Sequence, residues 1–155
     1  MSHLLRFCTS KELDSDLIRL HTDCIISHVE YYRTEDGETF GSRLDGGVKW
    51  RAPDESSPEN VIYSSFSGIE EAATWAAANR DGWPYDMLGI LGSALATDWH
   101  DNGKRFCSAL IAESMKETGV YPFSDMWPFW RVWPVHLLML RSMTLIAGPS
   151  GMVEF

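Results

Sequence analysis

Residues 25–33 read Ile-Ile-Ser-His-Val-Glu-Tyr-Tyr-Arg, and this stretch decides the fold of the chain. Its β-branched and aromatic residues favour a strand. Side chains two residues apart leave the same face of a strand, so His28 and Glu30 share a face. At this spacing their backbones are about 6–7 Å apart, which allows a direct contact. A polar ring in the middle of an otherwise apolar strand requires a chemical reason.

A hairpin follows this strand. Asp36-Gly37 is a strong turn signal, and Gly46-Gly47 gives a second turn. The short basic stretch 43–51 is mixed with Asp45 and is predicted to be a solvated strand face. With the strand 25–33 included, composition predicts five strands, at residues 4–8, 25–33, 39–44, 48–51 and 61–66.

Helical patterns occupy the remaining chain. Ser15 is the expected N-cap of a first short helix, and Ser67 with Glu70 forms a capping-box pattern. Residues 121–134 are rich in proline and tryptophan and indicate an ordered loop or short helical turns. The expected helices are 15–20, 67–78, 85–96, 105–118, which Gly119 ends, and 135–145. The pattern predicts an α+β fold, with a small antiparallel sheet packed against helices.

Length, charge and hydropathy restrict the class of protein. The 155 residues predict one domain over 1–155, and a net charge of −9 argues against a nucleic-acid partner. No apolar run is long enough to span a membrane, and the N-terminus lacks the apolar region of a signal peptide. We therefore expect a cytoplasmic protein without an integral membrane segment. No cofactor is indicated, and the oligomeric state stays open.

Cys107 is the candidate nucleophile among the cysteines at positions 8, 24 and 107, which form neither a disulfide framework nor a CxxC metal site. It falls in the first turn of the expected helix 105–118. Helix N-termini lower the pKa of a thiol, and their free N–H groups stabilise an oxyanion. The alternative is a buried cysteine that serves as a small apolar residue.

A thiolate nucleophile usually has a histidine as its base. His28 stands apart from the other four histidines because it lies within a strand and has Glu30 on the same face. His3 is close to the terminus, and His21 and His136 fall on helices. His100 lies between Asp98 and Asp101, which allows a metal-ligand interpretation, but a solvated turn is the better one, so no metal site is predicted.

The order of these residues resembles a known family. The motifs resemble the circularly permuted branch of the NlpC-type papain-like hydrolases, in particular its YiiX-like subgroup of small bacterial and phage members. In that branch the histidine strand precedes the cysteine helix, as His28 precedes Cys107 here. The resemblance covers residues from about 4 to about 140. It is carried by residues 27–30 (SHVE), 40–42 (FGS), 45–48 (DGGV), 85–86 (YD) and 106–108 (FCS).

The resemblance implies a cysteine peptidase or amidase acting on a peptide or amide substrate, such as a cell-wall (peptidoglycan) peptide. Cys107 would be the nucleophile and His28 the base. The third, polar residue varies in that superfamily, and we take Glu30, with Ser42 and Asp45 as alternatives. The residues expected to help hold the oxyanion or substrate are Tyr85, packed near the cysteine, and Ser108 at the start of the helix.

Two other functions remain open. The lecithin:retinol acyltransferase group shares this permuted order, so a lipid acyltransferase or thioesterase is the second hypothesis. The YiiX-like subgroup commonly has glutamate where this chain has Ala109. The third hypothesis is therefore a catalytically silent binding protein on the same fold. The tryptophans of the loop 121–134, at positions 127, 130 and 133, are expected to cap the core rather than to line a substrate groove.

Overall fold

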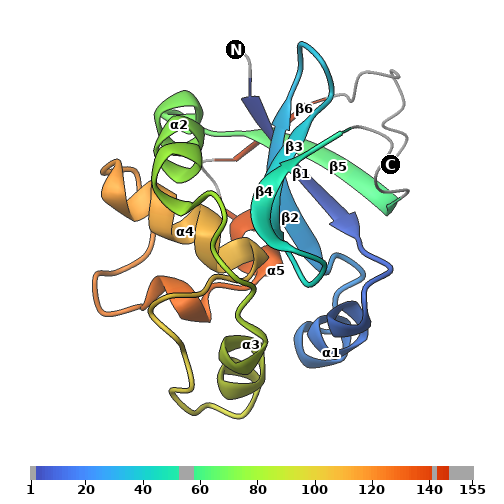
Figure 1. Cartoon of the computed structure of the whole chain (residues 1–155), viewed down its shortest axis with the longest axis vertical. Helices are drawn as coiled ribbons and strands as arrows, with labels where there is room; N and C mark the ends of the chain where they lie inside the picture. Colours follow the sequence, from blue (N-terminus) through green and yellow to red (C-terminus); the bar gives the residue numbers. More distant parts are fainter. Residues whose placement is uncertain (1–2, 53–57, 141–142, 147–155) are drawn as a thin grey trace.

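A computed structural model describes residues 3–52, 58–140 and 143–146 of the chain. Within this part, six strands form one sheet in the order β4-β3-β2-β1-β5-β6, and all neighbours are antiparallel (Figure 1). The sheet confirms the α+β class. The strands are β1 (His3–Thr9), β2 (His28–Arg33), β3 (Thr39–Arg43), β4 (Gly47–Arg51), β5 (Glu59–Ser65) and β6 (Thr144–Ile146).

The helices gather on one face of the sheet and at one of its ends. Helices α2 and α4 pack together and contact the sheet, while α1 and α3 lie at the lower end in Figure 1. None of the helices within the described ranges has the length and apolar character needed to cross a membrane. Their bounds are α1 (Leu13–Thr22), α2 (Ile69–Arg80), α3 (Met87–Ala94), α4 (Cys107–Glu117) and α5 (Pro134–Leu138), with a 3-10 turn, η1, at Phe129–Arg131.

Strand β2 lies between β1 and β3 and separates two environments. Val29 and Tyr31 point into the apolar core, whereas His28 and Glu30 occupy the alternate positions. Tyr31 crosses the core, and its hydroxyl lies 2.7 Å from the Ser114 hydroxyl of α4. The alternation thus joins the strand to the helices on one side and places polar groups on the other.

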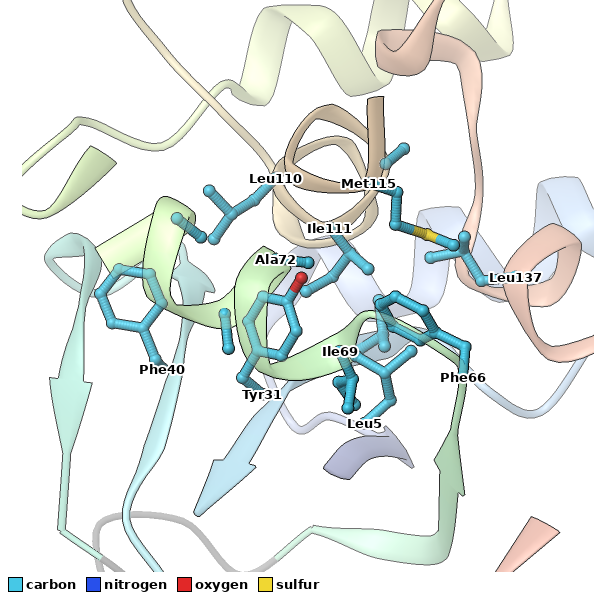
Figure 2. Close-up of a cluster of buried hydrophobic side chains, with 14 of the residues drawn as sticks. Leu5, Tyr31, Phe40, Phe66, Ile69, Ala72, Leu110, Ile111, Met115 and Leu137 are labelled. Atoms are coloured by element: carbon cyan, nitrogen blue, oxygen red, sulfur yellow. The ribbon is translucent and has the colours of Figure 1, made fainter. Parts of the chain in front are cut away.

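The core lies between the sheet and α2 and α4 (Figure 2). Every residue of α4 from Cys107 to Met115 is buried, so this helix is enclosed by the rest of the protein. Burial of each Leu or Ile side chain contributes about 1.5–3 kcal/mol, and α4 supplies two of them, Leu110 and Ile111. The position of α4 against the sheet is therefore strongly fixed.

Several predicted boundaries differ from the structure. Helix α1 begins at Leu13, and the Ser15 hydroxyl lies 2.6 Å from that of Ser27 instead of capping the helix. Helix α2 has Gly68 as its N-cap, so the predicted capping box is wrong. Glu70 instead accepts a hydrogen bond from the His3 backbone at 3.0 Å. In each case a distant partner replaced the local capping contact.

The predicted last helix, 135–145, is also wrong. Helix α5 ends at Leu138, and Thr144–Ile146 forms strand β6 against β5. The apolar run fits either structure by periodicity, and the open edge of β5 supplies backbone partners that favour a strand. Residues 141–142 of this run lie outside the described residues.

Gly41 is required where β3 passes β2. A Cβ atom at this position would lie 2.6 Å from the Cβ of Glu30, which is closer than side chains tolerate. The absence of a side chain thus makes room for the buried Glu30 carboxylate.

Replacement of Gly41 by alanine is expected to lower the free energy of unfolding by about 1–3 kcal/mol, because the new methyl group displaces the buried Glu30. Urea denaturation measures this change. Gly103→Ala is the matched control, because the nearest atom to its new Cβ is 3.4 Å away. Equal stability of the two variants would contradict the packing argument.

Candidate functional site

Cys107 is the first residue of α4, directly after the extended N-cap Phe106. The first helical hydrogen bond runs from the Leu110 N–H to the Phe106 carbonyl, so the N–H groups of Cys107 and Ser108 have no partner within the helix. These groups and the helix dipole place positive potential at the thiol. The residue is only 1% exposed.

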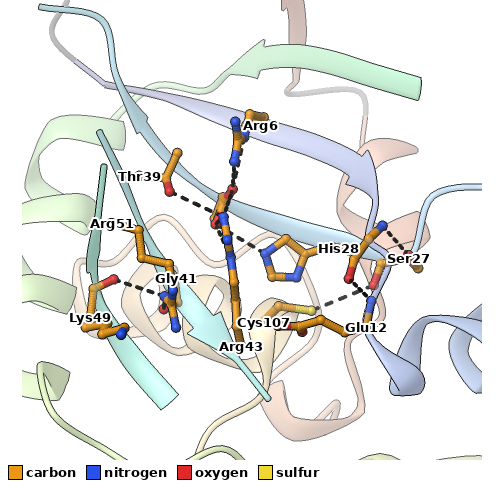
Figure 3. Close-up of polar contacts among 12 residues, drawn as sticks. Arg6, Glu12, Ser27, His28, Thr39, Gly41, Arg43, Lys49, Arg51 and Cys107 are labelled. Atoms are coloured by element: carbon orange, nitrogen blue, oxygen red, sulfur yellow. Dashed lines mark hydrogen bonds and ion pairs between the residues drawn. The ribbon is translucent and has the colours of Figure 1, made fainter. Parts of the chain in front are cut away.

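His28 begins β2, and Figure 3 draws it together with Cys107. Its Nε2 atom lies 3.2 Å from Oε2 of Glu30, and Cys107 is close enough to the same ring to raise the pKa of His28. Since Nε2 is used by the carboxylate, Nδ1 is the nitrogen left for the thiol. The sulfur also lies 4.0 Å from the Ser27 carbonyl oxygen. The structure thus brings together the predicted nucleophile, base and third residue.

Two arginines hold the Glu30 carboxylate, which is fully buried. Arg6 lies opposite Glu30 in the β1–β2 register and donates to Oε1, with its Nε at 2.9 Å. Arg43, at the end of β3, donates to both oxygens, with Nη2 at 2.9 Å from Oε2 and 3.0 Å from Oε1. Glu30 therefore has its orientation fixed from two strands.

These charges determine the protonation of the pair. Burial alone would lower the pKa of His28, but the hydrogen bonds to Cys107 and Glu30 and the charge of Glu30 raise it well above its ordinary value. Burial alone would raise the pKa of Glu30, but His28, Arg43 and Arg6 hold it well below its ordinary value. The arrangement favours an imidazolium next to Cys107 and an ionised Glu30.

The two alternative third residues lie elsewhere. The Ser42 hydroxyl donates to the Arg105 carbonyl at 2.5 Å, which fixes the chain just before α4. Asp45 has a largely exposed side chain, 3.7 Å from Nη2 of Arg51. Of the three candidates, only Glu30 forms a hydrogen bond with His28 among the described contacts.

The basic stretch 43–51 is not a solvated strand face as predicted. Arg43 and Arg51 are both buried. Glu30 neutralises Arg43, while Arg51 donates to the backbone carbonyls of Gly41 and Gly47 at 2.9 and 2.8 Å. Buried acceptors thus compensate the charges, which composition alone does not reveal.

The two predicted oxyanion or substrate residues have other hydrogen-bond partners. Tyr85 packs against the apolar cluster that includes Cys107, and its hydroxyl donates to Oδ2 of Asp14. Burial raises the pKa of Tyr85, with further contributions from Cys107 and Asp14. The Ser108 hydroxyl donates to the Val132 carbonyl at 2.6 Å, so its backbone N–H is the group available near Cys107.

The turn around His100 is exposed at residues 98–99 and 101–103, as predicted, but the His100 side chain itself is not solvated. This side chain is 4% exposed, and its ring stacks on Trp130 with centroids 4.9 Å apart. Nδ1 of His100 lies 2.8 Å from the fully buried Asp86, which also caps α3. The aromatic loop covers this pair, in agreement with the expectation that its tryptophans cap the core, although Trp127 is 44% exposed.

Sequence reasoning missed Arg6, Arg43 and Asp14 as members of the site. Arg6 and Arg43 belong to Glu30 only through strand register, which the sequence does not specify. Asp14 lies in α1, far from Tyr85 in sequence. The one available signal was alternation, because Arg6 and Arg43 fall on the same strand faces as Glu30.

The class defined by this geometry is an α+β protein with a cysteine at a helix start facing a strand histidine. No family model and no curated protein sequence matches the chain. Among solved structures, it resembles the crystal structure of metalloprotein YiiX from Escherichia coli O157:H7, with a TM-score of 0.70 and 17% identity. The match covers 95% of this chain and 96% of YiiX. The protein therefore has a YiiX-like fold.

The charge on Glu30 should determine the pH up to which His28 stays protonated. Free histidine has a pKa of about 6.5. The raised pKa of His28 keeps its imidazole protonated above that pH. In Glu30→Gln the negative charge is lost, so the His28 titration midpoint should fall toward that ordinary value. NMR of the histidine ring measures this midpoint.

Asp45→Asn removes an equal charge from the alternative third residue and should leave the His28 midpoint in place. Urea titration first checks that each variant is folded. A fall of the midpoint in Asp45→Asn but not in Glu30→Gln would show that Glu30 is not the partner of the base.

Proposed function

We propose that the protein is a cysteine hydrolase of the peptidase or amidase kind, built as one permuted papain-like domain over residues 1–155. The observation that carries the proposal is the meeting of three residues at the N-terminus of α4: Cys107 begins the helix, His28 lies close enough for Cys107 to act on its pKa, and Glu30 lies 3.2 Å from His28 Nε2. A thiol beside an imidazole that a carboxylate orients is the arrangement used in nucleophilic catalysis.

The reaction follows from these groups. The proton of Cys107 passes to the neutral form of His28, which gives the imidazolium that the charge of Glu30 stabilises, and the thiolate attacks the carbonyl carbon of an amide. The N–H groups of Cys107 and Ser108 stabilise the oxyanion. The His28 imidazolium then gives its proton to the leaving amine as the C–N bond breaks, leaving a thioester. Finally, His28 removes a proton from water, which attacks the thioester and releases the acid and the thiol.

The YiiX-like fold and the chain order support the permuted papain-like assignment. The strand that carries His28 precedes the helix that carries Cys107, in the order of the permuted NlpC-type branch. Peptidoglycan peptides are the substrate that this resemblance suggests, and the cytoplasm is the location we propose for the chain.

YiiX is described as a metalloprotein, so we tested whether this chain has a comparable set of donors. No group of three or more His, Cys, Asp or Glu side chains is arranged to hold a metal ion in the described part of the chain. At the site itself, the Glu30 oxygens accept from two arginines, whose positive charges oppose a cation. These residues do not fit a metal, and the proposed steps use none.

A lipid acyl substrate is the second candidate, and an apolar surface favours it. Four exposed leucines lie on helices α1 and α3 and at the end of α3: Leu13 and Leu20 in α1, Leu88 in α3, and Leu95 as the C-cap of α3. Exposed apolar side chains of this kind mark surfaces that bind apolar partners. Transfer or hydrolysis of an acyl group would use the same Cys107 and His28.

Alkylation by iodoacetamide near neutral pH tests the nucleophile. Cys107 should react faster than Cys8 or Cys24, because it lies beside the base His28 and at the start of α4, where free N–H groups favour a developing negative charge on the sulfur. His28→Ala should lower the rate at Cys107 about 100-fold, within the usual contribution of a catalytic acid–base group. Peptide mapping by mass spectrometry assigns the adducts.

Hydrolysis assays then separate the substrates. The protein is tested on peptidoglycan fragments and on detergent-solubilised lipid esters, with Cys107→Ala as the inactive variant and Cys24→Ala as the matched cysteine control. Cleavage of the fragments that Cys107→Ala abolishes supports the amidase, and cleavage of the lipids supports the second candidate. If Cys107 reacts no faster than Cys24 and neither substrate is cleaved, the chain is a binding protein.

A further inference from the structure

Asp14 has a buried oxygen atom without a partner. The residue is 94% buried, and its Oδ2 accepts the hydrogen bond of the Tyr85 hydroxyl. Its Oδ1 has no hydrogen-bond partner among the described residues. A buried acceptor left unpaired costs free energy that a ligand with an N–H donor would recover. Tyr85, which fixes this carboxylate, packs against the cluster that contains Cys107.

Glu12 adds a second carboxylate to the same region. It precedes α1, and its Oε2 accepts the Leu44 N–H at 3.2 Å. Its carboxyl is close enough to His28 and to Asp14 for both charges to act on it, and Figure 3 draws it with His28 and Cys107. Burial raises the pKa of Glu12, and the charge of Asp14 raises it further, whereas His28 lowers it. Two acidic residues thus lie at the start of α1.

The nearby cations are already paired with other groups. Arg6 and Arg43 bind Glu30. Glu12 also lines a cavity of about 210 Å³, where Lys11 pairs with Glu59 and Arg19 with Asp16. His28 is likewise paired with Glu30, and its charge also acts on Glu12. The cavity gives space for a substrate group beside Glu12.

From these contacts we infer that Asp14 and Glu12 form a subsite for a protonated amine of the substrate, close to the carbonyl carbon that Cys107 attacks. The unpartnered Oδ1 of Asp14 accepts one N–H of the ammonium group, and Glu12 supplies a second acceptor. The amine is either the α-amino group of an N-terminal residue or the side-chain amine of a basic or diamino acid. This inference rests on the proposed nucleophile and narrows its substrates to amides that carry a cation.

A pair of thiol reagents tests the subsite without a known substrate. N-(2-aminoethyl)chloroacetamide carries a cation, and its N-acetyl derivative carries the same reactive group without the charge. The cationic reagent should alkylate Cys107 about tenfold faster than the neutral one, as expected for one charge-assisted hydrogen bond. Cys24 in the same sample reports the intrinsic reactivity of each reagent.

In Asp14→Asn the cationic reagent should alkylate Cys107 only about one to three times as fast as the neutral one, because the amide removes the charge but keeps the shape of the side chain. Asp23→Asn is the matched control. It removes the same charge from the exposed, left-handed C-cap of α1, a conformation that asparagine adopts readily, and should leave the ratio of the two rates unchanged. If Asp14→Asn does not fold, Glu12→Gln should also lower the ratio.

Substrates separate the two sources of the amine. The aminomethylcoumarin amides of Ala and Lys, each with a free or an acetylated α-amino group, distinguish an α-ammonium from a side-chain ammonium. Equal alkylation of Cys107 by both reagents, or an unchanged preference in Asp14→Asn and Glu12→Gln, overturns the amine subsite. A cation preference without hydrolysis of any amide keeps the subsite and overturns the hydrolase, whereas no alkylation of Cys107 overturns both.

Discussion

The buried ion cluster around Glu30 is the constraint on which the rest of the structure depends. One carboxylate faces two guanidinium groups and an imidazole inside the protein. Removal of one partner from a buried pair is strongly destabilising, by about 3–5 kcal/mol, so β1, β2 and β3 must keep one register. Gly41 belongs to the same constraint, because a side chain there would occupy the space of Glu30.

The sheet and α4 each supply one half of the candidate site. The sheet fixes His28 through Glu30, and the enclosed helix fixes Cys107 and its N–H groups. The contact between the two halves is held by a hydrogen bond from Ser42 of β3 to the Arg105 carbonyl just before α4. Neither half depends on a loop, so the base and the thiol are placed by rigid elements.

Local pattern was sufficient for the elements that carry the chemistry. Alternation in residues 25–33 predicted the strand and the pairing of His28 with Glu30, and the apolar pattern after Cys107 predicted α4. Arg43 and Arg51 were predicted to be solvent-exposed, because the sequence does not reveal their acceptors, which lie on another strand or on the backbone. The same reason explains the failure at His100, whose covering ring and carboxylate come from Trp130 and Asp86.

The Glu30 cluster also has a consequence for how this fold changes in evolution. A chain that loses Glu30 keeps two buried arginines without a counter-charge. The cost of these unpaired charges is a large share of the net stability of a domain, which is typically about 5–15 kcal/mol. Selection for folding alone therefore retains Glu30, even in descendants that no longer catalyse anything. Cys107 is outside this ion cluster and is under no such requirement, so its persistence, rather than that of Glu30 and its partner His28, distinguishes an active lineage from a silent one.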